Sequence, residues 1–248
     1  MKFQTAITTI KDGQELVRGY KLTDLAEQKS FSDAIWLLLR GEFPTPAEAK
    51  MFGAILTITL DHGSGTASAQ ATRIAASVKT SIQAAVAAGL LAMGERHIGA
   101  LDSAAKFFVE NSETKDLSAL LADLKSKKIR VPGFGHSVLT IDHRSQTLLS
   151  MAKETGFYKT YSQFAEEVEK ELNAQASKPL PLNVDGTVAG ILLDMGFTPG
   201  ALTGIFIIGR IPGLVAQATE EMQADLGLRR LPEEEIEYTG PAPREIGV

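Results

Sequence analysis

The stretch SVKTSIQAAVAAGLLAMG, residues 77–94 of this 248-residue chain, has a strong helical signal. Alanine has the highest helix propensity of all residues, so we expect a helix over this stretch. Its apolar face is wide, which indicates a helix that is surrounded by others or lies in a subunit interface. Apolar residues recur at helical spacing on both sides of it, from residue 22 to the charged tail at 229–248. The pattern therefore predicts an all-α protein.

Strand signals are confined to the N-terminus. A Thr- and Ile-rich run at 5–10, an Asp-Gly turn at 12–13 and a short run at 15–19 predict a β-hairpin. Near the C-terminus, residues 187–208 are apolar, but several glycines and Pro199 divide them. A membrane span needs about 20 unbroken apolar residues, so we expect a buried helix, a turn and a second buried helix. The first residues also lack the apolar run of a signal peptide, which favours a soluble cytoplasmic protein without membrane contact.

Composition excludes several kinds of function. The chain contains no Cys, so disulfides, Cys-ligated metals and thiol nucleophiles are excluded. A formal net charge of −5 argues against a nucleic-acid partner. The four His show no HxxxH or HExxH spacing, so we expect no metal site. The basic segment 125–130 is typical of a solvated helix end, and nucleotide-phosphate binding is its alternative interpretation.

Polar residues that could carry chemistry lie at breaks between the apolar helices. Glycine beside a titratable group lets backbone N–H groups approach a ligand, and helix N-termini favour anions. Helix capping or core packing explains any one of these residues equally well, but several such breaks in one chain favour a binding site. They are Asp61-His62-Gly63, His97, His136, His143-Arg144, Asp185 and Arg210.

Taken in chain order, these motifs resemble the citrate synthase superfamily, most of all its citryl-CoA lyase branch, which is also the C-terminal module of ATP-citrate lyase. The matching stretches are VRGYKLTDLAEQKSFSDAIWLLLRGEFPT (17–45), DHGSGTASAQATRIAAS (61–77), AAGLLAMGERHIGALDSAAKFF (87–108), VPGFGHSVLTIDHR (131–144), LNVDG (182–186) and GALTGIFIIGRIPGLVAQATEE (200–221). The resemblance implies a citrate synthase-like multi-helical fold with a short N-terminal β-hairpin. Residues 1–100 and 191–248 would form a large helical domain, and residues 101–190 a small lid domain with the catalytic turns.

The resemblance also implies roles for individual residues. Asp185 would move the proton at the acetyl carbon, His136 would hydrogen-bond the carbonyl that becomes the tertiary alcohol, and His97 would hydrogen-bond the thioester carbonyl. His62, Arg144 and Arg210 would hold the oxaloacetate end of the substrate. A C-terminal arginine would reach the site of a partner subunit, with Arg230 as our choice and Arg229 as the alternative. The coenzyme A site would include Val131, Pro132, Gly133, Phe134 and Gly135.

The implied function is citryl-CoA lyase, the retro-Claisen cleavage of citryl-CoA to acetyl-CoA and oxaloacetate. This reaction passes through an enolate, which needs a carboxylate to move a proton and a donor to stabilise the oxyanion. No metal or tightly bound cofactor is implied, because the coenzyme A thioester is itself the substrate. The expected assembly is a homodimer or higher homo-oligomer with shared active sites, and a separate citryl-CoA synthetase is a candidate partner.

Two features favour the lyase over a synthase: the short chain, and Gly186 after Asp185, where synthases usually carry an aromatic residue. One feature favours the opposite direction, since His97 matches the synthase histidine. A citrate or 2-methylcitrate synthase, condensing an acyl-CoA with oxaloacetate, is therefore the alternative. A non-catalytic oligomeric paralogue is a third interpretation.

Overall fold

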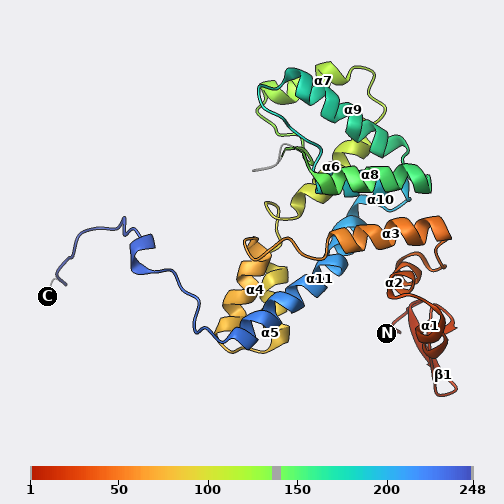
Figure 1. Cartoon of the computed structure of the whole chain (residues 1–248), viewed down its shortest axis with the longest axis horizontal. Helices are drawn as coiled ribbons and strands as arrows, with labels where there is room; N and C mark the ends of the chain where they lie inside the picture. Colours follow the sequence, from red (N-terminus) through yellow and green to blue (C-terminus); the bar gives the residue numbers. More distant parts are fainter. Residues whose placement is uncertain (1, 136–140, 247–248) are drawn as a thin grey trace. The chain divides into compact units, whose positions relative to one another are not determined.

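The computed structural model describes residues 2–135 and 141–246. It is built mainly of helices, with one small sheet near the N-terminus (Figure 1), so the all-α prediction is confirmed. The strands are β1 (Thr8–Lys11), β2 (Gln14–Val17) and β3 (Tyr20–Lys21). The helices are α1 (Leu22–Gln28), α2 (Phe31–Arg40), α3 (Pro46–Ile58), α4 (Ala67–Ser77), α5 (Ile82–Leu91), α6 (Gly99–Asn111), α7 (Leu117–Ser126), α8 (His143–Thr155), α9 (Thr160–Gln175), α10 (Val184–Asp194), α11 (Pro199–Ala224) and the short 3-10 helix η1 (Glu233–Glu235).

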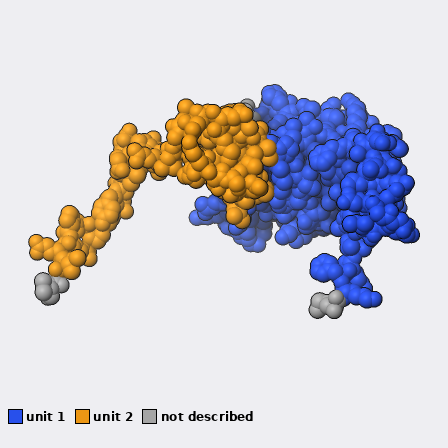
Figure 2. All heavy atoms as spheres, turned by 90° about the horizontal axis from the view of Figure 1, so that it is seen from below, with its two compact units in different colours: residues 1–62, 93–213 blue, residues 63–92, 214–248 orange. Residues whose placement is uncertain are grey.

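The chain divides into two compact units, which Figure 2 colours separately. Unit 1 contains residues 1–62 and 93–213, and unit 2 contains residues 63–92 and 214–248. Helix α11 begins in unit 1 and ends in unit 2. The division into a large domain and a lid with its boundary near residue 100 stays a prediction.

The N-terminal sheet is an antiparallel meander in the order β1-β2-β3. Asp12 and Gly13 both have positive φ, at 52° and 73°, which is the conformation of a two-residue hairpin turn that matches the strand twist. Arg18 and Gly19 repeat this geometry and lead into β3. The hairpin was therefore predicted correctly, and the third strand was missed because it is only two residues long.

Helix α10 is the central helix of unit 1. Its residues from Gly186 to Leu193 are all buried, and it packs against α6, α8 and α9. The apolar stretch 187–208 is thus a buried helix, a turn and the first part of α11, as the glycines predicted. Of the helices in the described residues, α11 alone is long and apolar enough to cross a membrane, although Arg210 and Pro212 lie within it. The N-terminus of α10 carries polar residues, Asn183 as its cap and Asp185 in its first turn.

The alanine-rich stretch that was predicted as one helix over 77–94 contains a break. Helix α4 ends at Ser77, Lys79 adopts a left-handed conformation with φ of 60°, and α5 starts at Ile82. The side chain of Ser81 accepts a hydrogen bond from the Ala84 N–H, so capping by serine outweighs the helix propensity of the run. The small residues do bring the two helices together, because a β-carbon at Gly89 would lie 2.0 Å from the Thr72 Oγ1.

Candidate functional site

The N-terminus of α10 carries Asp185 in its first turn. Asn183 caps this helix, and its side-chain oxygen accepts hydrogen bonds from the N–H groups of Asp185 and Gly186, both at 3.1 Å. The Asn183 backbone N–H donates to the Gly133 carbonyl at 3.0 Å, and its amide nitrogen donates to the Gly135 carbonyl at 3.0 Å. The sequence motifs LNVDG and VPGFG, which are far apart in the chain, are therefore joined at this point.

Burial raises the pKa of the Asp185 carboxyl above its ordinary value. The positive charges of Arg144 and Arg210 act in the opposite direction, and the negative charge of Asp142 adds to the effect of burial. A carboxyl group with a raised pKa that lies among charged partners is typical of acid–base catalysis. Asp185 can thus hold a proton at a higher pH than an ordinary aspartate.

Arg144 lies in the first turn of α8 and connects His62 with Asp142. Its Nη1 lies 3.1 Å from the His62 Nδ1, and its Nε and Nη2 donate to the Asp142 carboxylate at 2.9 and 2.8 Å. A guanidinium group has only donors, so the His62 Nδ1 is the acceptor. The neutral His62 ring must then carry its proton on Nε2.

Arg210 is buried, with a relative exposure of 4%, and comes from α11. Its Nε donates to the Thr59 carbonyl just after α3 at 2.8 Å, and its guanidinium lies over the Phe206 ring at 5.1 Å. Burial lowers the pKa of Arg210, while the charges of Asp61 and Asp185 favour its charged form. Arg210 is therefore a buried cation whose charge is favoured by two carboxylates.

His97 lies in the turn before α6 and is partly buried. Burial lowers its pKa, and the positive charge of Arg210 lowers it further. Both effects favour the neutral imidazole, which can donate a hydrogen bond without delivering a full proton.

The structure thus brings five of the predicted residues into one network of contacts and charges in unit 1. They are His62, His97, Arg144, Asp185 and Arg210. The predicted catalytic residue His136 lies outside the described residues. Arg230 is exposed in unit 2, while Arg229 pairs there with the buried Glu221. The roles assigned to all these residues stay predictions.

Sequence reasoning missed Asp142. This residue is buried, precedes α8 as its N-cap and accepts hydrogen bonds from Arg144 and from the Val184 N–H. Burial acts to raise the pKa of its carboxyl, but the hydrogen bonds and charge of Arg144, with the Val184 N–H, hold that pKa below its usual value. An Asp directly before a helix is a capping signal, and the motif IDHR contains such an Asp.

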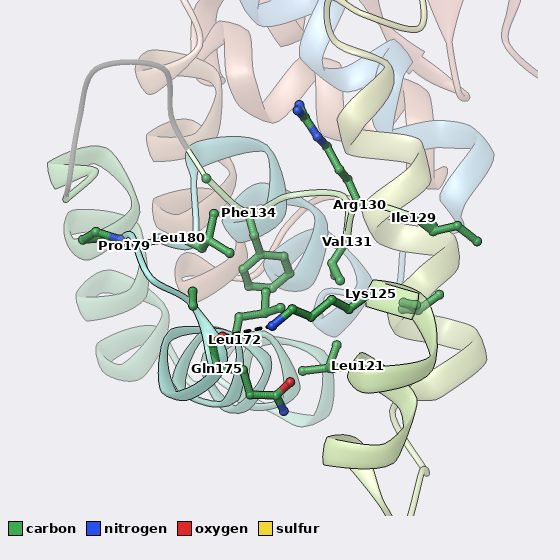
Figure 3. Close-up of a pocket in the computed structure, with 13 residues that line it drawn as sticks. Leu121, Lys125, Ile129, Arg130, Val131, Phe134, Leu172, Gln175, Pro179 and Leu180 are labelled. Atoms are coloured by element: carbon green, nitrogen blue, oxygen red, sulfur yellow. Dashed lines mark hydrogen bonds between the residues drawn. The ribbon is translucent and has the colours of Figure 1, made fainter. Parts of the chain in front are cut away.

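A cavity of about 660 Å³ lies between α7, α9 and the segment that leads to Gly135. Figure 3 shows the Phe134 ring pointing toward Leu172 on α9, with Lys125 beside it. Lys125 donates a hydrogen bond from its Nζ to the Gln175 carbonyl at 3.2 Å. Arg130 also lines the cavity. Three residues of the predicted coenzyme A site line the cavity: Val131, Phe134 and Gly135. An apolar cavity of this size with cationic groups suits a flat ring that carries phosphates.

Comparison with known proteins places these features in context. A family described as "Citrate synthase, C-terminal domain" matches residues 1–57 and 44–231. The structure of a citryl-CoA lyase from Hydrogenobacter thermophilus is similar, with 40% identity, a TM-score of 0.92, and coverage of 99% of this chain and 97% of that one. An ATP citrate lyase from Methanothrix soehngenii, solved in complex with citrate and coenzyme A, is 27% identical with a TM-score of 0.85 and covers 98% of this chain and 42% of its own.

A probable ATP-citrate synthase from Dictyostelium discoideum is 31% identical over 254 residues, which is 94% of this chain and 41% of that protein. The chain therefore spans less than half the length of the curated relatives that it matches.

Proposed function

The chain belongs to the citrate synthase family, and we propose that it cleaves citryl-CoA into acetyl-CoA and oxaloacetate. The observation that carries this proposal is the likeness to a citryl-CoA lyase over nearly the whole length of both chains. The likeness to an ATP citrate lyase, a longer protein that this chain matches over 98% of its own length, also supports a lyase reaction.

The proposed cleavage breaks the bond between the carbinol carbon and the carbon next to the thioester. The hydroxyl group loses its proton and becomes the oxaloacetate carbonyl, and the electron pair of the broken bond forms the enolate of acetyl-CoA. The enolate carbon then takes a proton from the Asp185 carboxyl, and the raised pKa of that carboxyl favours the protonated form that this step needs. The hydroxyl proton leaves toward the group that contacts this oxygen, which the family resemblance assigns to His136.

His97 is proposed to donate a hydrogen bond to the thioester oxygen, where negative charge develops. A neutral imidazole suits this task because it stabilises the oxyanion without fully protonating it, and burial beside Arg210 favours that neutral form. Arg144 and Arg210 are proposed to bind the carboxylates of the oxaloacetate end, together with His62. Three N–H groups of Arg144 are used by Asp142 and His62, so two of its five remain for a substrate carboxylate.

The coenzyme A portion is proposed to occupy the cavity lined by Phe134. Its apolar wall would receive the adenine ring, and Lys125 and Arg130 would lie near the phosphates. The complex of the similar ATP citrate lyase with coenzyme A supports a site for this ligand in the shared fold.

A homodimer or higher homo-oligomer is part of the proposal. Large apolar side chains of α4 and α5 in unit 2 are exposed, including Ile74, Ile82 and Leu91, and Leu91 is 87% exposed. We propose that a second copy of the chain covers them, and that Arg230 reaches the neighbouring site as the family resemblance implies. A separate citryl-CoA synthetase and a cytoplasmic location also stay proposals.

The alternative is a citrate synthase, which His97 favours because it matches the synthase histidine. Two parallel incubations separate the two functions: acetyl-CoA with oxaloacetate, and citryl-CoA alone, each followed by the release of free coenzyme A. The lyase proposal predicts little free coenzyme A in either incubation. Rapid release of coenzyme A with formation of citrate would instead establish the synthase.

A further inference from the structure

The carboxylate of Asp142 lies where two helices of the site begin. Its side chain is 1% exposed. Each of its two oxygens accepts two hydrogen bonds. Oδ1 accepts from the backbone N–H and the Nε of Arg144, at 3.0 and 2.9 Å. Oδ2 accepts from the Arg144 Nη2 at 2.8 Å and from the Val184 N–H at 3.1 Å. A carboxylate offers about four acceptor positions, so this one is fully used.

These four bonds connect groups that come from distant parts of the chain. Two of them hold the Arg144 guanidinium by its edge, a bidentate contact that fixes the plane of the group as well as its position. Another holds Val184, the first residue of α10 and the neighbour of Asp185. The far side of the same guanidinium contacts the His62 Nδ1. One carboxylate therefore sets the positions of an arginine, a histidine and the start of the helix that carries Asp185.

We propose that Asp142 is a positioning residue for the cleavage reaction: it orients Arg144 toward the substrate carboxylate, holds His62 in one tautomer through Arg144, and fixes the first turn of α10 relative to both. This inference rests on the proposed function for its effect on catalysis. Its structural part, the ordering of Arg144 and His62, is independent of which reaction the site performs.

Asparagine is the sharpest substitution at this position because it has the same shape as aspartate. It replaces one carboxylate oxygen by an NH₂ group, and every orientation of that group faces two N–H donors. The NH₂ group therefore faces either two N–H donors of Arg144, or one of Arg144 and that of Val184. It cannot accept a hydrogen bond from any of them. The side chain volume is unchanged, so a loss of function would not result from a cavity.

Asp194 offers a matched control. Its carboxylate also serves a helix start, since it accepts from the backbone N–H groups of Lys159, Tyr161 and Ser162 at 3.0, 3.0 and 2.9 Å. These hydrogen bonds all go to the start of α9 and its flank. Asp194→Asn thus removes a comparable structural contact without altering the contacts of Arg144.

The experiment measures kcat and KM with citryl-CoA, the melting temperature, and the ¹⁵N spectrum of the His62 imidazole for the full-length wild type, Asp142→Asn and Asp194→Asn. For Asp142→Asn we expect kcat/KM to fall on the order of 10²-fold, because small misplacements of positioned groups cost that much. We also expect His62 to lose its single Nε2-protonated tautomer. Asp194→Asn should lower the melting temperature while its kcat, KM and His62 spectrum stay those of the wild type.

The proposal is overturned if Asp142→Asn keeps the wild-type kinetic constants and His62 spectrum, or if both variants lose activity equally. Should Asp142→Asn fail to fold, the wild-type spectrum decides, since a proton on the His62 Nδ1 contradicts the proposed orientation by Arg144. A wild type that does not cleave citryl-CoA would refute the proposed function, while the His62 spectra would still test the role of Asp142.

Discussion

Gly186 lies so close to Gly133 that a β-carbon added at residue 186 would stand 2.5 Å from the Gly133 carbonyl oxygen. The reverse also holds, because a β-carbon at Gly133 would lie 2.8 Å from the Gly186 Cα. This contact places the turn that lines the cavity beside Phe134 directly against the helix turn that carries Asp185. It also gives a structural reason for glycine after Asp185, where an aromatic side chain would force the two segments apart.

We expect Gly186→Ala to destabilise the protein by about 1–3 kcal/mol, because overpacking against backbone cannot be relieved by a rotamer change. The free energy of unfolding in denaturant measures this effect. Gly204→Ala is the control, since no atom lies within 4 Å of its new β-carbon and alanine favours helix. That variant should gain about 0.5–1 kcal/mol. Equal stability of the two variants would contradict the close contact.

We expect Asp185→Asn to lower kcat by about 10²- to 10⁴-fold, the usual contribution of general acid–base catalysis. The same variant should be more stable than the wild type at neutral pH. The folded pKa of Asp185 is raised, so the unfolded chain releases this proton first as pH rises, and the folded state loses stability between the unfolded and the folded pKa. Asparagine cannot ionise and avoids that loss.

Thermal melting of both proteins across pH tests the stability part of this prediction. The advantage of Asp185→Asn should vanish below the ordinary Asp pKa of 3.8, where the carboxyl is protonated in both states. An advantage that persists unchanged at low pH, or a wild type that is more stable at pH 7, would show that burial does not raise the pKa of Asp185.

The cavity that we propose for coenzyme A can be filled by substitution at its wall. Ala176 lines the cavity at the end of α9, whereas Ala174 is exposed on the same helix and lies outside it. We expect Ala176→Trp to weaken coenzyme A binding by about tenfold or more, a change of roughly 1.4 kcal/mol. Calorimetric titration with coenzyme A measures this, with Ala174→Trp as the control of matched size. Unchanged affinity in Ala176→Trp would place the coenzyme A site elsewhere.

The two C-terminal arginines, Arg229 and Arg230, should affect different properties when replaced: stability for Arg229 and KM for Arg230. The Glu221 side chain is 1% exposed and pairs with both Arg73 and Arg229, so Arg229→Ala should lower the stability of the protein by removing one partner of a buried carboxylate. Arg230→Ala should leave stability within about 0.5 kcal/mol, as is usual for exposed positions. If Arg230 completes a neighbouring site, its loss raises KM for citryl-CoA. A stable Arg229→Ala, or an Arg230→Ala with unchanged KM, would refute the respective role.

The sequence predicted those features that depend on local signals. Helical spacing and the Asp-Gly turn identified the helices and the hairpin, although the helix expected from residue 187 begins three residues earlier, at Val184. The break after Ser77 was missed because alanine propensity, summed over a window, hides a single capping serine. The role of Asp142 was missed because it depends on a meeting with Val184, which lies 42 residues away in the chain. Such contacts arise from packing and leave no periodic signal in the sequence.

We infer that this chain breaks the carbon–carbon bond of citryl-CoA with Asp185 as the proton donor. The most direct test is a mass-spectrometric analysis of the products that the purified wild type forms from citryl-CoA, with Asp185→Asn beside it. We expect acetyl-CoA and oxaloacetate in equal amounts from the wild type, and a strongly slowed reaction in the variant. Citrate and free coenzyme A as the products, or equal rates for the two proteins, would contradict it.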